Sequence, residues 1–233
     1  MSFTLEGSVV LVTGANGGLG EQFVAQALER GATKVYATAR SPREWGDPRV
    51  VPLVLDVTDD ASVAVAAAAA SDTTLVVNNA GISEPAPISG SATPLRAIFE
   101  TNFFGALAIA REFAPVLAGN GGGALLNVHS VLSWIGLAGA YSASKAALWS
   151  ATNSLRLELA PQGTLVTGLH LGYTDTPMTV DIDAPKNDPA QVVRDAYAGV
   201  EAGEYEILAD QLSIDVKQGL AAPIVGMYPQ LAA

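Results

Sequence analysis

Short runs of β-branched and aliphatic residues alternate along the chain with longer stretches rich in alanine and leucine. Such alternation is typical of strand–helix–strand units, in which parallel strands form a sheet and the intervening helices cover it. We expect strands at 8–13, 34–39, 50–55, 74–78, 124–130, 164–171 and 205–209. We expect helices at 18–30, 60–71, 94–118, 139–160 and 189–202. The pattern therefore predicts an α/β fold, a doubly wound parallel sheet with helices on both faces.

One domain, residues 1–233, accounts for the whole length. No linker or internal repeat divides the chain, and single α/β domains of roughly 200–250 residues are common. Hydrophobic residues make up 49% of the sequence, which is enough for a sizeable core. We therefore expect one sheet and one domain.

The composition argues against several classes of function. Twelve lysines and arginines stand against 23 acidic residues, and a net charge of −11 repels nucleic acid and anionic membranes. No apolar stretch approaches the roughly 20 residues that span a bilayer, and no signal-peptide pattern opens the chain. Without cysteine, disulfides and thiol catalysis are excluded, and two histidines cannot hold a metal by themselves. We expect a cytoplasmic protein without metal, nucleic-acid or membrane partners.

The first predicted strand leads directly into a glycine-rich turn, Thr13-Gly-Ala-Asn-Gly-Gly-Leu-Gly20, and a helix with periodic apolar residues follows. In a strand–turn–helix unit of this kind, backbone N–H groups and the helix N-terminus face a pyrophosphate. Gly14 would permit the tight turn, Gly18 the approach of a phosphate, and Gly20 the close packing of helix on strand. An ordinary loop is the alternative, but the position after the first strand favours a dinucleotide site.

The end of the second predicted strand bears on the choice between NAD and NADP. NAD-binding proteins place an acidic residue there to hold the ribose 2′-hydroxyl, but here the strand runs into Arg40, and the first acid is Glu44. An arginine can pair with a 2′-phosphate through two hydrogen bonds, and Arg43 is a second candidate. A surface role for Arg40 is the alternative, and the glycine turn offers no basic residue. We predict NADP(H) as the cofactor, ahead of NAD(H).

Three residues in the second half of the chain form a candidate catalytic group. Tyr141 and Lys145 lie four positions apart on a predicted helix, so both project from one face. A nearby ammonium favours the phenolate and lowers the pKa of a tyrosine, which can then exchange a proton with a carbonyl or alcohol oxygen. Ser130 ends the strand predicted at 124–130, at the edge where doubly wound sheets bind ligands. The Tyr141–Lys145 pair alone would be interpreted as surface residues, but its position after a strand ending in serine and downstream of a dinucleotide turn favours catalysis.

Taken in order, these motifs resemble the classical short-chain dehydrogenases/reductases, a family with a Rossmann-type fold. The resemblance covers about residues 5–178. It rests on Thr13-Gly-x-x-x-Gly-x-Gly20, Asp56-Val57, Asn78-Asn79-Ala80-Gly81, Asn102, Ser130 and Tyr141-Ser-Ala-Ser-Lys145. It implies a cofactor-binding half at about 5–120 and a catalytic and substrate half at about 121–233.

The resemblance also implies roles for residues that composition and spacing leave unassigned. Asp56 and Val57 would flank the adenine, and Asn79, Ala80 and Gly81 would line the ribose side. Contacts with the cofactor are expected from this set as a whole: Gly14, Asn16, Gly18, Leu19, Gly20, Arg40, Asp56, Val57, Asn79, Ala80, Gly81, Tyr141, Lys145, Gly172 and Thr176.

Around the nicotinamide, the resemblance implies a proton relay. Asn102 would bend its helix and hold a water that connects to Lys145, and Lys145 would also hydrogen-bond the nicotinamide ribose. Thr176 would contact the carboxamide. The expected catalytic residues are therefore Asn102, Ser130, Tyr141 and Lys145.

Four features depart from the family pattern. Ser130 and Tyr141 are only 11 positions apart, about two fewer than usual. Leu171 stands where the family has proline. His129 replaces a small or aliphatic neighbour of the serine, and we interpret it as a packed side chain rather than a proton carrier. The tail beyond Met178 lacks the family's usual ending.

The residues around the expected site suggest a substrate and an assembly. Its flanks are mostly apolar, which suits a small hydrophobic ketone or aldehyde: Val131, Leu132, Trp134, Ile135, Leu171 and Tyr173. The helices predicted at 94–118 and 139–160 carry more apolar residues than one sheet contact should bury: Phe104, Leu107, Leu148, Trp149 and Leu155. The family pairs these helices, so we expect a homodimer or homotetramer.

Three alternatives remain. A nucleotide-sugar epimerase or dehydratase shares the glycine spacing, but it normally carries a larger C-terminal substrate domain. A dehalogenase on the same scaffold would lose the cofactor turn and replace the lysine, whereas Gly18, Gly20 and Lys145 are present. A non-catalytic NADP(H)-binding or sensor protein would have no need of Ser130, Tyr141 and Lys145 together.

Overall fold

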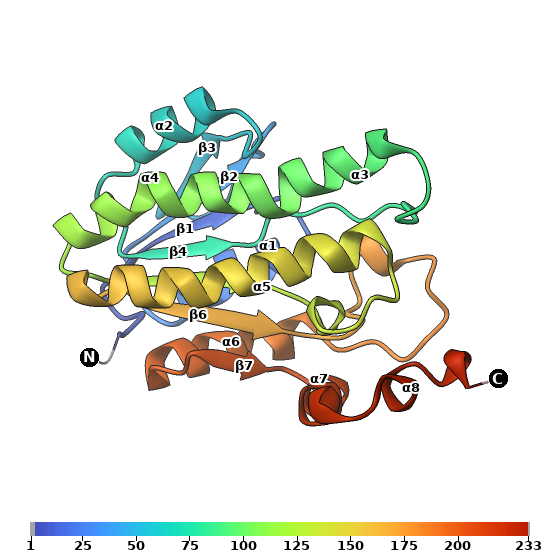
Figure 1. Ribbon diagram of the computed structural model, residues 1–233. Coiled ribbons are helices and arrows are strands. Elements are labelled where there is room, and N and C mark those ends of the chain that lie inside the picture. The colour runs from blue at the N-terminus through green and yellow to red at the C-terminus, as the bar shows by residue number, and fades with distance from the viewer. Residues whose placement is uncertain (1–2, 233) are drawn as a thin grey trace.

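A computed structural model describes residues 3–232. Its seven strands form one sheet in the order β3-β2-β1-β4-β5-β6-β7, and every neighbouring pair is parallel (Figure 1). The strands are β1 (Val9–Thr13), β2 (Lys34–Ala39), β3 (Val50–Val54), β4 (Leu75–Asn78), β5 (Ala124–Val128), β6 (Leu165–His170) and β7 (Glu206–Leu208). The doubly wound parallel sheet expected from the sequence is confirmed.

Helices lie in every connection between the strands except that from β2 to β3, and others follow the last strand. They are α1 (Leu19–Glu29), α2 (Asp60–Ala69), α3 (Ala92–Phe99), α4 (Ala106–Gly119), α5 (Ala140–Leu159), α6 (Pro189–Ala202), α7 (Gln211–Gln218) and α8 (Ile224–Met227). Within residues 3–232, no helix combines the length and the apolar character needed to cross a bilayer.

The helices of the structure differ from the prediction in two respects. The helix predicted at 94–118 is split, because the π-helical segment η1 (Glu100–Gly105) separates α3 from α4. Helices α7 and α8 were not predicted at all. They are short, and α7 begins because the Asp210 carboxylate accepts a hydrogen bond from the N–H of Ser213 at 2.7 Å. A cap of this kind is a weak signal when no long apolar period follows it.

The strand pleat divides the core into two layers. Val10 and Val12 of β1 point to the face covered by α1 and α6, and Leu11 points to the face covered by α2, α4 and α5. All three side chains are fully buried. Figure 1 shows α2, α4 and α5 together on one side of the sheet. Because both faces are covered, the central strands are mostly apolar instead of alternating regularly with polar residues.

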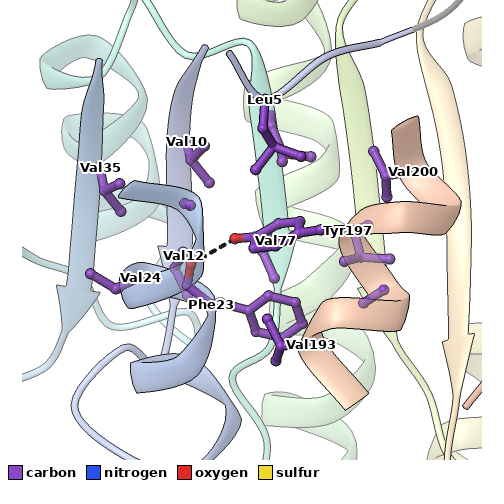
Figure 2. Close-up of a cluster of buried hydrophobic side chains, with 14 of the residues drawn as sticks. Leu5, Val10, Val12, Phe23, Val24, Val35, Val77, Val193, Tyr197 and Val200 are labelled. Atoms are coloured by element: carbon purple, nitrogen blue, oxygen red, sulfur yellow. Dashed lines mark hydrogen bonds between the residues drawn. The ribbon is translucent and has the colours of Figure 1, made fainter. Parts of the chain in front are cut away.

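Helices α1 and α6 are joined across the first of these layers by an aromatic contact (Figure 2). The rings of Phe23 and Tyr197 pack edge to face with centroids 5.4 Å apart. The Tyr197 hydroxyl donates to the Phe23 carbonyl oxygen at 2.8 Å, so this buried polar group is satisfied. The contact fixes α1, and with it the glycine turn at its start, to the second half of the chain.

The carboxyl ends of the strands meet at one edge of the sheet, on the right in Figure 1, where α3, the segment after β6 and the C-terminal helices also lie. Strand order reverses between β1 and β4, because the chain continues outward from β1 to β2 and β3 and then returns to β4. In doubly wound sheets a ligand crevice opens at such a reversal. This edge is therefore where the site is to be sought.

Candidate active site

The glycine turn after β1 has the backbone conformation that its sequence predicts. Gly14 and Gly18 have φ angles of +66° and +58°, in the left-handed region that favours glycine. A side chain at Gly20 would collide with the carbonyl oxygen of Gly14, so helix and turn pack without space between them. Leu19 is half-buried and packs against the core on this side of the sheet.

The start of α1 is suited to an anion. Within residues 3–232, no side chain caps this helix, and an added side-chain atom at Gly17 would meet nothing within 4 Å. The first N–H groups of a helix have no partner inside it, and the helix dipole adds positive potential at the same end. The turn therefore fits the pyrophosphate of a dinucleotide, which the N–H groups of this helix start would hold.

The turn is fixed to the end of β4 by hydrogen bonds around Thr13. The Thr13 hydroxyl oxygen accepts from the N–H groups of Asn79 and Ala80, at 3.0 and 2.9 Å. The Asn79 amide donates in return to the carbonyl oxygens of Thr13 and Gly14, at 2.9 and 3.1 Å. A side-chain atom at Gly14 would lie 3.1 Å from the Cα of Ala80. The segments expected to hold the pyrophosphate and the ribose are thus in direct contact.

The residues expected near the adenosine lie beside the end of β2. Asn16 donates from its side chain to the Ser41 carbonyl oxygen at 2.8 Å, which holds the turn against this loop. Arg40 is exposed, and its charge helps lower the pKa of Asp56, although hydrogen bonds from Thr58 are the larger cause. The structure therefore places Arg40 and Asp56 in the same region.

Two further side chains complete this region. Val57 packs against Gly105 of η1, where a side-chain atom would come within 2.8 Å of it. Arg43, the second candidate for a phosphate contact, forms an ion pair with Glu21 at 2.6 Å and lies 4.1 Å from the ring centroid of Trp45. Arg43 is thus engaged within the chain, whereas Arg40 makes no ion pair in the described part of the structure.

Asn102 lies inside η1, buried, where the helix departs from α-helical pairing. Its side chain accepts from the Ile82 N–H at 2.8 Å and donates to the Ile82 carbonyl oxygen at 2.9 Å. It also donates to the Ser144 hydroxyl at 3.2 Å, and this hydroxyl donates to the Tyr141 carbonyl oxygen at 2.8 Å. A π-helical turn frees backbone groups and often marks a functional position. Asn102 thus joins the segment after β4 to the start of α5.

Lys145 is buried near Asn102 and the end of β5. Its ammonium donates to the carbonyl oxygen of Val128 at 2.8 Å. An atom added at Gly81 would lie 3.3 Å from the Asn102 side-chain oxygen and 3.9 Å from the Lys145 ammonium. Burial lowers the pKa of Lys145 to about 8. The expected relay partners, Asn102 and Lys145, are therefore brought to one place beside Gly81.

The charge state of Tyr141 differs from the sequence-based prediction. Burial raises the pKa of Tyr141 to about 12, and a hydrogen bond with the Ser130 side chain lowers it only in part. The Lys145 ammonium lies 5.8 Å from the centroid of the Tyr141 ring and is bonded to a carbonyl oxygen. The prediction that Lys145 brings the Tyr141 pKa below its ordinary value is wrong for this arrangement, because burial is the larger effect. Tyr141 is held as a phenol, which is the form that donates a proton.

Ser130 lies two residues beyond the end of β5, so the strand is shorter than the predicted 124–130. Its hydroxyl accepts from the Leu132 N–H at 3.1 Å and reaches the Leu171 carbonyl oxygen at 3.5 Å. Ser133 is used differently, because its hydroxyl accepts the Ser130 N–H at 3.3 Å. The Ser130 side chain helps to lower the pKa of Tyr141, so the short connection to α5 leaves the two residues near each other.

The segment after β6 returns across the glycine turn. Thr176 is half-buried, and an atom added at Gly18 would lie 3.4 Å from its Cβ. Gly172 donates its N–H to the Asp210 carboxylate at 2.6 Å. The carboxamide and phosphate ends of the expected site therefore lie next to each other. Asp210 comes from the C-terminal part of the chain, where no site residue was predicted.

Behind Ser130 is a buried stack of rings. His170 lies between His129 and Trp134, with ring centroids 4.8 and 4.0 Å away. Both histidines are almost fully buried, and the His129 ring is 3.1 Å from the Thr152 hydroxyl. His129 is a packed side chain, as predicted. Trp134, expected at the substrate pocket, is used in the stack.

Within residues 3–232, no three acidic or histidine side chains converge in a way that would hold a metal ion.

With this geometry in place, the chain was compared with known proteins. The family model described as short chain dehydrogenase matches residues 8–187. The chain belongs to the short-chain dehydrogenase/reductase family. It is 34% identical over 188 residues to the Short-chain dehydrogenase ptmH of Penicillium ochrochloron, covering 74% of this chain and 68% of the relative. It is 33% identical over 192 residues to the Cis-4-hydroxycyclohexanecarboxylate dehydrogenase of Sinomonas cyclohexanicum, covering 76% and 77%.

Solved structures of short-chain dehydrogenases extend the likeness to the C-terminal tail. One from Burkholderia cenocepacia, in complex with NADP, is 39% identical, with a TM-score of 0.92 over 99% of this chain and 100% of that one. Another, from Burkholderia phymatum in complex with NAD, shares the fold at 23% identity, with a TM-score of 0.82 over 92% and 93%. The tail that departs from the usual family ending is therefore matched in the first of these structures.

The paired histidines predict a loss of stability in mild acid. Burial lowers the pKa of His129 well below its ordinary value of 6.5 and that of His170 to about 3. Both side chains therefore take up protons in the unfolded chain before they do in the folded one. Their contribution is complete above pH 6.5 and is lost as the pH falls toward the folded values. Between pH 6.5 and 5.0, each contributes a loss of up to about 2 kcal/mol.

Urea unfolding at pH 7.5 and 5.0 measures this loss. In a His170→Gln variant, the difference in unfolding free energy between the two pH values should be about half that of the wild type. An unchanged difference would show that other groups cause the acid sensitivity.

Proposed function

We propose that this dehydrogenase/reductase transfers a hydride between NADP(H) and a carbonyl or alcohol, with a small hydrophobic ketone or aldehyde as the reduced substrate. The observation that carries the proposal is the convergence of Ser130, Tyr141, Lys145 and Asn102 next to the glycine turn. When bound, the nicotinamide supplies or accepts the hydride. The residues of this chain supply orientation and the proton.

Each of the four residues has a separate task in this proposal. Ser130 holds the substrate oxygen, because its hydroxyl lies beside the tyrosine and is fixed by the Leu132 N–H. Tyr141 gives its phenolic proton to that oxygen in reduction and takes it back in oxidation. Lys145 would bind a nicotinamide ribose hydroxyl, with its ammonium held in place by the Val128 carbonyl oxygen. Asn102 keeps the segment of Ile82 and the start of α5 in register.

Because burial raises the pKa of Tyr141 to about 12, its phenol is protonated near neutral pH and can donate to a carbonyl oxygen. Oxidation of an alcohol needs the phenolate as a base. The apolar side chains of Val131, Leu132, Ile135 and Leu171, buried or half-buried, agree with a hydrophobic substrate.

The preference for NADP(H) over NAD(H) rests on Arg40. This residue follows β2 directly, where an acid would repel a 2′-phosphate, and it is exposed without an ion pair among the described residues. The related Burkholderia cenocepacia structure contains NADP, whereas other members of the fold contain NAD. Arg43 contributes less, because Glu21 already neutralises it.

We also propose one domain over residues 1–233, a cytoplasmic location and a homodimer or homotetramer. Three of the five apolar residues expected at an interface make contacts inside the chain: Leu148 is buried, Leu155 packs against the core, and Trp149 packs against Trp134. Phe104, next to α4, and Leu157 on α5 are 52% and 79% exposed, and they support pairing of these helices.

The role of Tyr141 predicts the outcome of a single substitution. Tyr141→Phe keeps the ring but removes the proton donor, so kcat for carbonyl reduction should fall by about 100-fold or more. NADPH affinity should change little, as measured by quenching of cofactor fluorescence. Tyr205→Phe, the same change at an exposed position, serves as the control. Retention of more than about a tenth of the wild-type kcat would contradict the assignment, and a wild type without any turnover would favour a non-catalytic cofactor-binding protein.

The cofactor preference predicts an asymmetric effect at the end of β2. Arg40→Asp should lower kcat/KM for NADPH by about 10- to 150-fold, the value of one charge-assisted contact, and leave NADH equal or better. Arg43→Gln should cost much less, because that arginine is paired with Glu21. If wild type already prefers NADH, or if both cofactors weaken equally, Arg40 is a surface residue.

The assembly is tested by light scattering at micromolar concentration, where we expect the mass of two or four chains. Leu157→Glu should shift the protein toward the monomer, because it places a charge on the exposed face of α5. A wild-type monomer would overturn this part of the proposal.

A further inference from the structure

We infer that Asp210 is a positioning residue that holds the segment after β6 in its cofactor-binding conformation. This inference rests on the proposed function, because it concerns the segment from Gly172 to Thr176 expected at the nicotinamide. It assigns a role in cofactor binding to a residue beyond the region matched by the family model, which ends at 187.

The Asp210 carboxylate connects three parts of the chain. One oxygen, Oδ2, accepts from the Gly172 N–H and from the Asn187 side-chain amide, both at 2.6 Å. The other oxygen, Oδ1, accepts from the Ser213 N–H at 2.7 Å, at the start of α7. Hydrogen bonds to a charged acceptor are shorter and stronger than neutral ones. The Asp210 side chain thus connects both ends of the segment 172–187 to the start of α7.

The two ends of this segment also bind each other. Asn187 donates its N–H to the Tyr173 carbonyl oxygen at 2.8 Å, and its own carbonyl oxygen accepts the Asp175 N–H at 3.0 Å. Thr174 and Asn187 form an isolated parallel bridge. The segment is therefore closed at a narrow neck, and Asp210 lies at that neck.

The neck lies between the catalytic serine and the glycine turn. Before it, the Leu171 carbonyl oxygen accepts the Val131 N–H at 2.8 Å, one residue after Ser130. After it, Thr176 lies against Gly18. A movement at Gly172 would displace Thr176 from the turn while the serine stays fixed to Leu171. Loss of the Asp210 contacts should therefore weaken cofactor binding more than it slows the chemical step.

The residue at position 172 supports this interpretation. An atom added at Gly172 would lie 3.2 Å from Oδ2 of Asp210 and 3.3 Å from a methyl carbon of Leu212. A side chain there would push away the carboxylate that Gly172 binds. The glycine is thus suited to the close approach of Asp210.

Asp210→Asn separates this role from the helix cap. Asparagine is as good a cap as aspartate, so its oxygen can still accept from Ser213. Its NH₂ group then replaces Oδ2 and faces two donors, Gly172 N–H and the Asn187 amide, which it cannot accept. The substitution should break the contacts to the neck and retain α7. The control is Asp215→Asn, an exposed residue of α7 whose side chain accepts a hydrogen bond only from Gln211 among residues 3–232.

The experiment has a readout without cofactor and one with it. In hydrogen–deuterium exchange of the protein alone, peptides from 172–187 of Asp210→Asn should exchange about tenfold faster, while peptides from α5 remain unchanged. In steady-state kinetics, KM for NADPH should rise about tenfold with kcat within about twofold, and the dissociation constant from a fluorescence titration should rise in parallel. Asp215→Asn should match the wild type in each measurement.

A second variant covers the case in which Asp210→Asn folds poorly. Asn187→Ala removes one contact at the neck and leaves Gly172 and Ser213 bonded to Asp210, so it should change the same quantities in the same direction by a smaller factor. Wild-type exchange in 172–187, an unchanged KM, or equal acceleration throughout the chain would overturn the inference. If wild type reduces no carbonyl, the proposed function fails, but exchange and the NADPH titration still judge the role of Asp210.

Discussion

The hydroxyl of Thr13 holds together the segments that follow β1 and β4, at the edge of the sheet where the proposed dinucleotide site lies. At the reversal of strand order, β1 and β4 are neighbours whose chains leave in opposite directions, so nothing in the ladder itself fixes the loops beyond them. The buried Thr13 oxygen accepts two backbone N–H groups from the segment after β4, and Asn79 bonds back to the carbonyl oxygens of Thr13 and Gly14. The glycine turn, Gly81 and the residues near it take their positions from this junction.

The parts of the site that the sequence predicted are those in which the backbone conformation selects the residue. Gly14 and Gly18 have positive φ, and Gly20 has no room for a side chain, so each position favours glycine and can be recognised in the sequence. The parallel strands could also be predicted, because burial on both faces favours continuous apolar runs. The contacts of Asp210 could not be predicted from the sequence in this way. An aspartate before a short helix is a common cap, and only the folded chain brings Gly172 and Asn187 to it.

Residue spacing also failed where burial decides an electrostatic outcome. Four positions on a helix bring Tyr141 and Lys145 near each other, and this predicted a tyrosine with a lowered pKa. In the structure both side chains are held in a region where burial disfavours every charge, so the pKa of Tyr141 rises and that of Lys145 falls. The helix period fixes which residues meet but not the dielectric around them. The interruption of the predicted helix at Glu100–Gly105 was expected only from the family resemblance, which implied a bend at Asn102. No proline in this segment marks it, and the Asn102 side chain hydrogen-bonds Ile82 there.

The cofactor half and the substrate half of the expected site are therefore supported by different kinds of contact. Around the turn, the groups suited to hold a pyrophosphate are backbone N–H groups, fixed by glycines and by one threonine close in the sequence. Around the expected substrate position, support comes from groups distant in the chain: the Leu171 carbonyl oxygen holds the serine loop, the ring stack lies behind it, and the Asp210 side chain fixes Gly172 from beyond β7. Backbone support can bind a common cofactor without regard to the rest of the chain. The residues of the C-terminal part that support the substrate side can differ without changing the glycine turn. Short motifs therefore predict a nucleotide cofactor, whereas they do not predict the substrate.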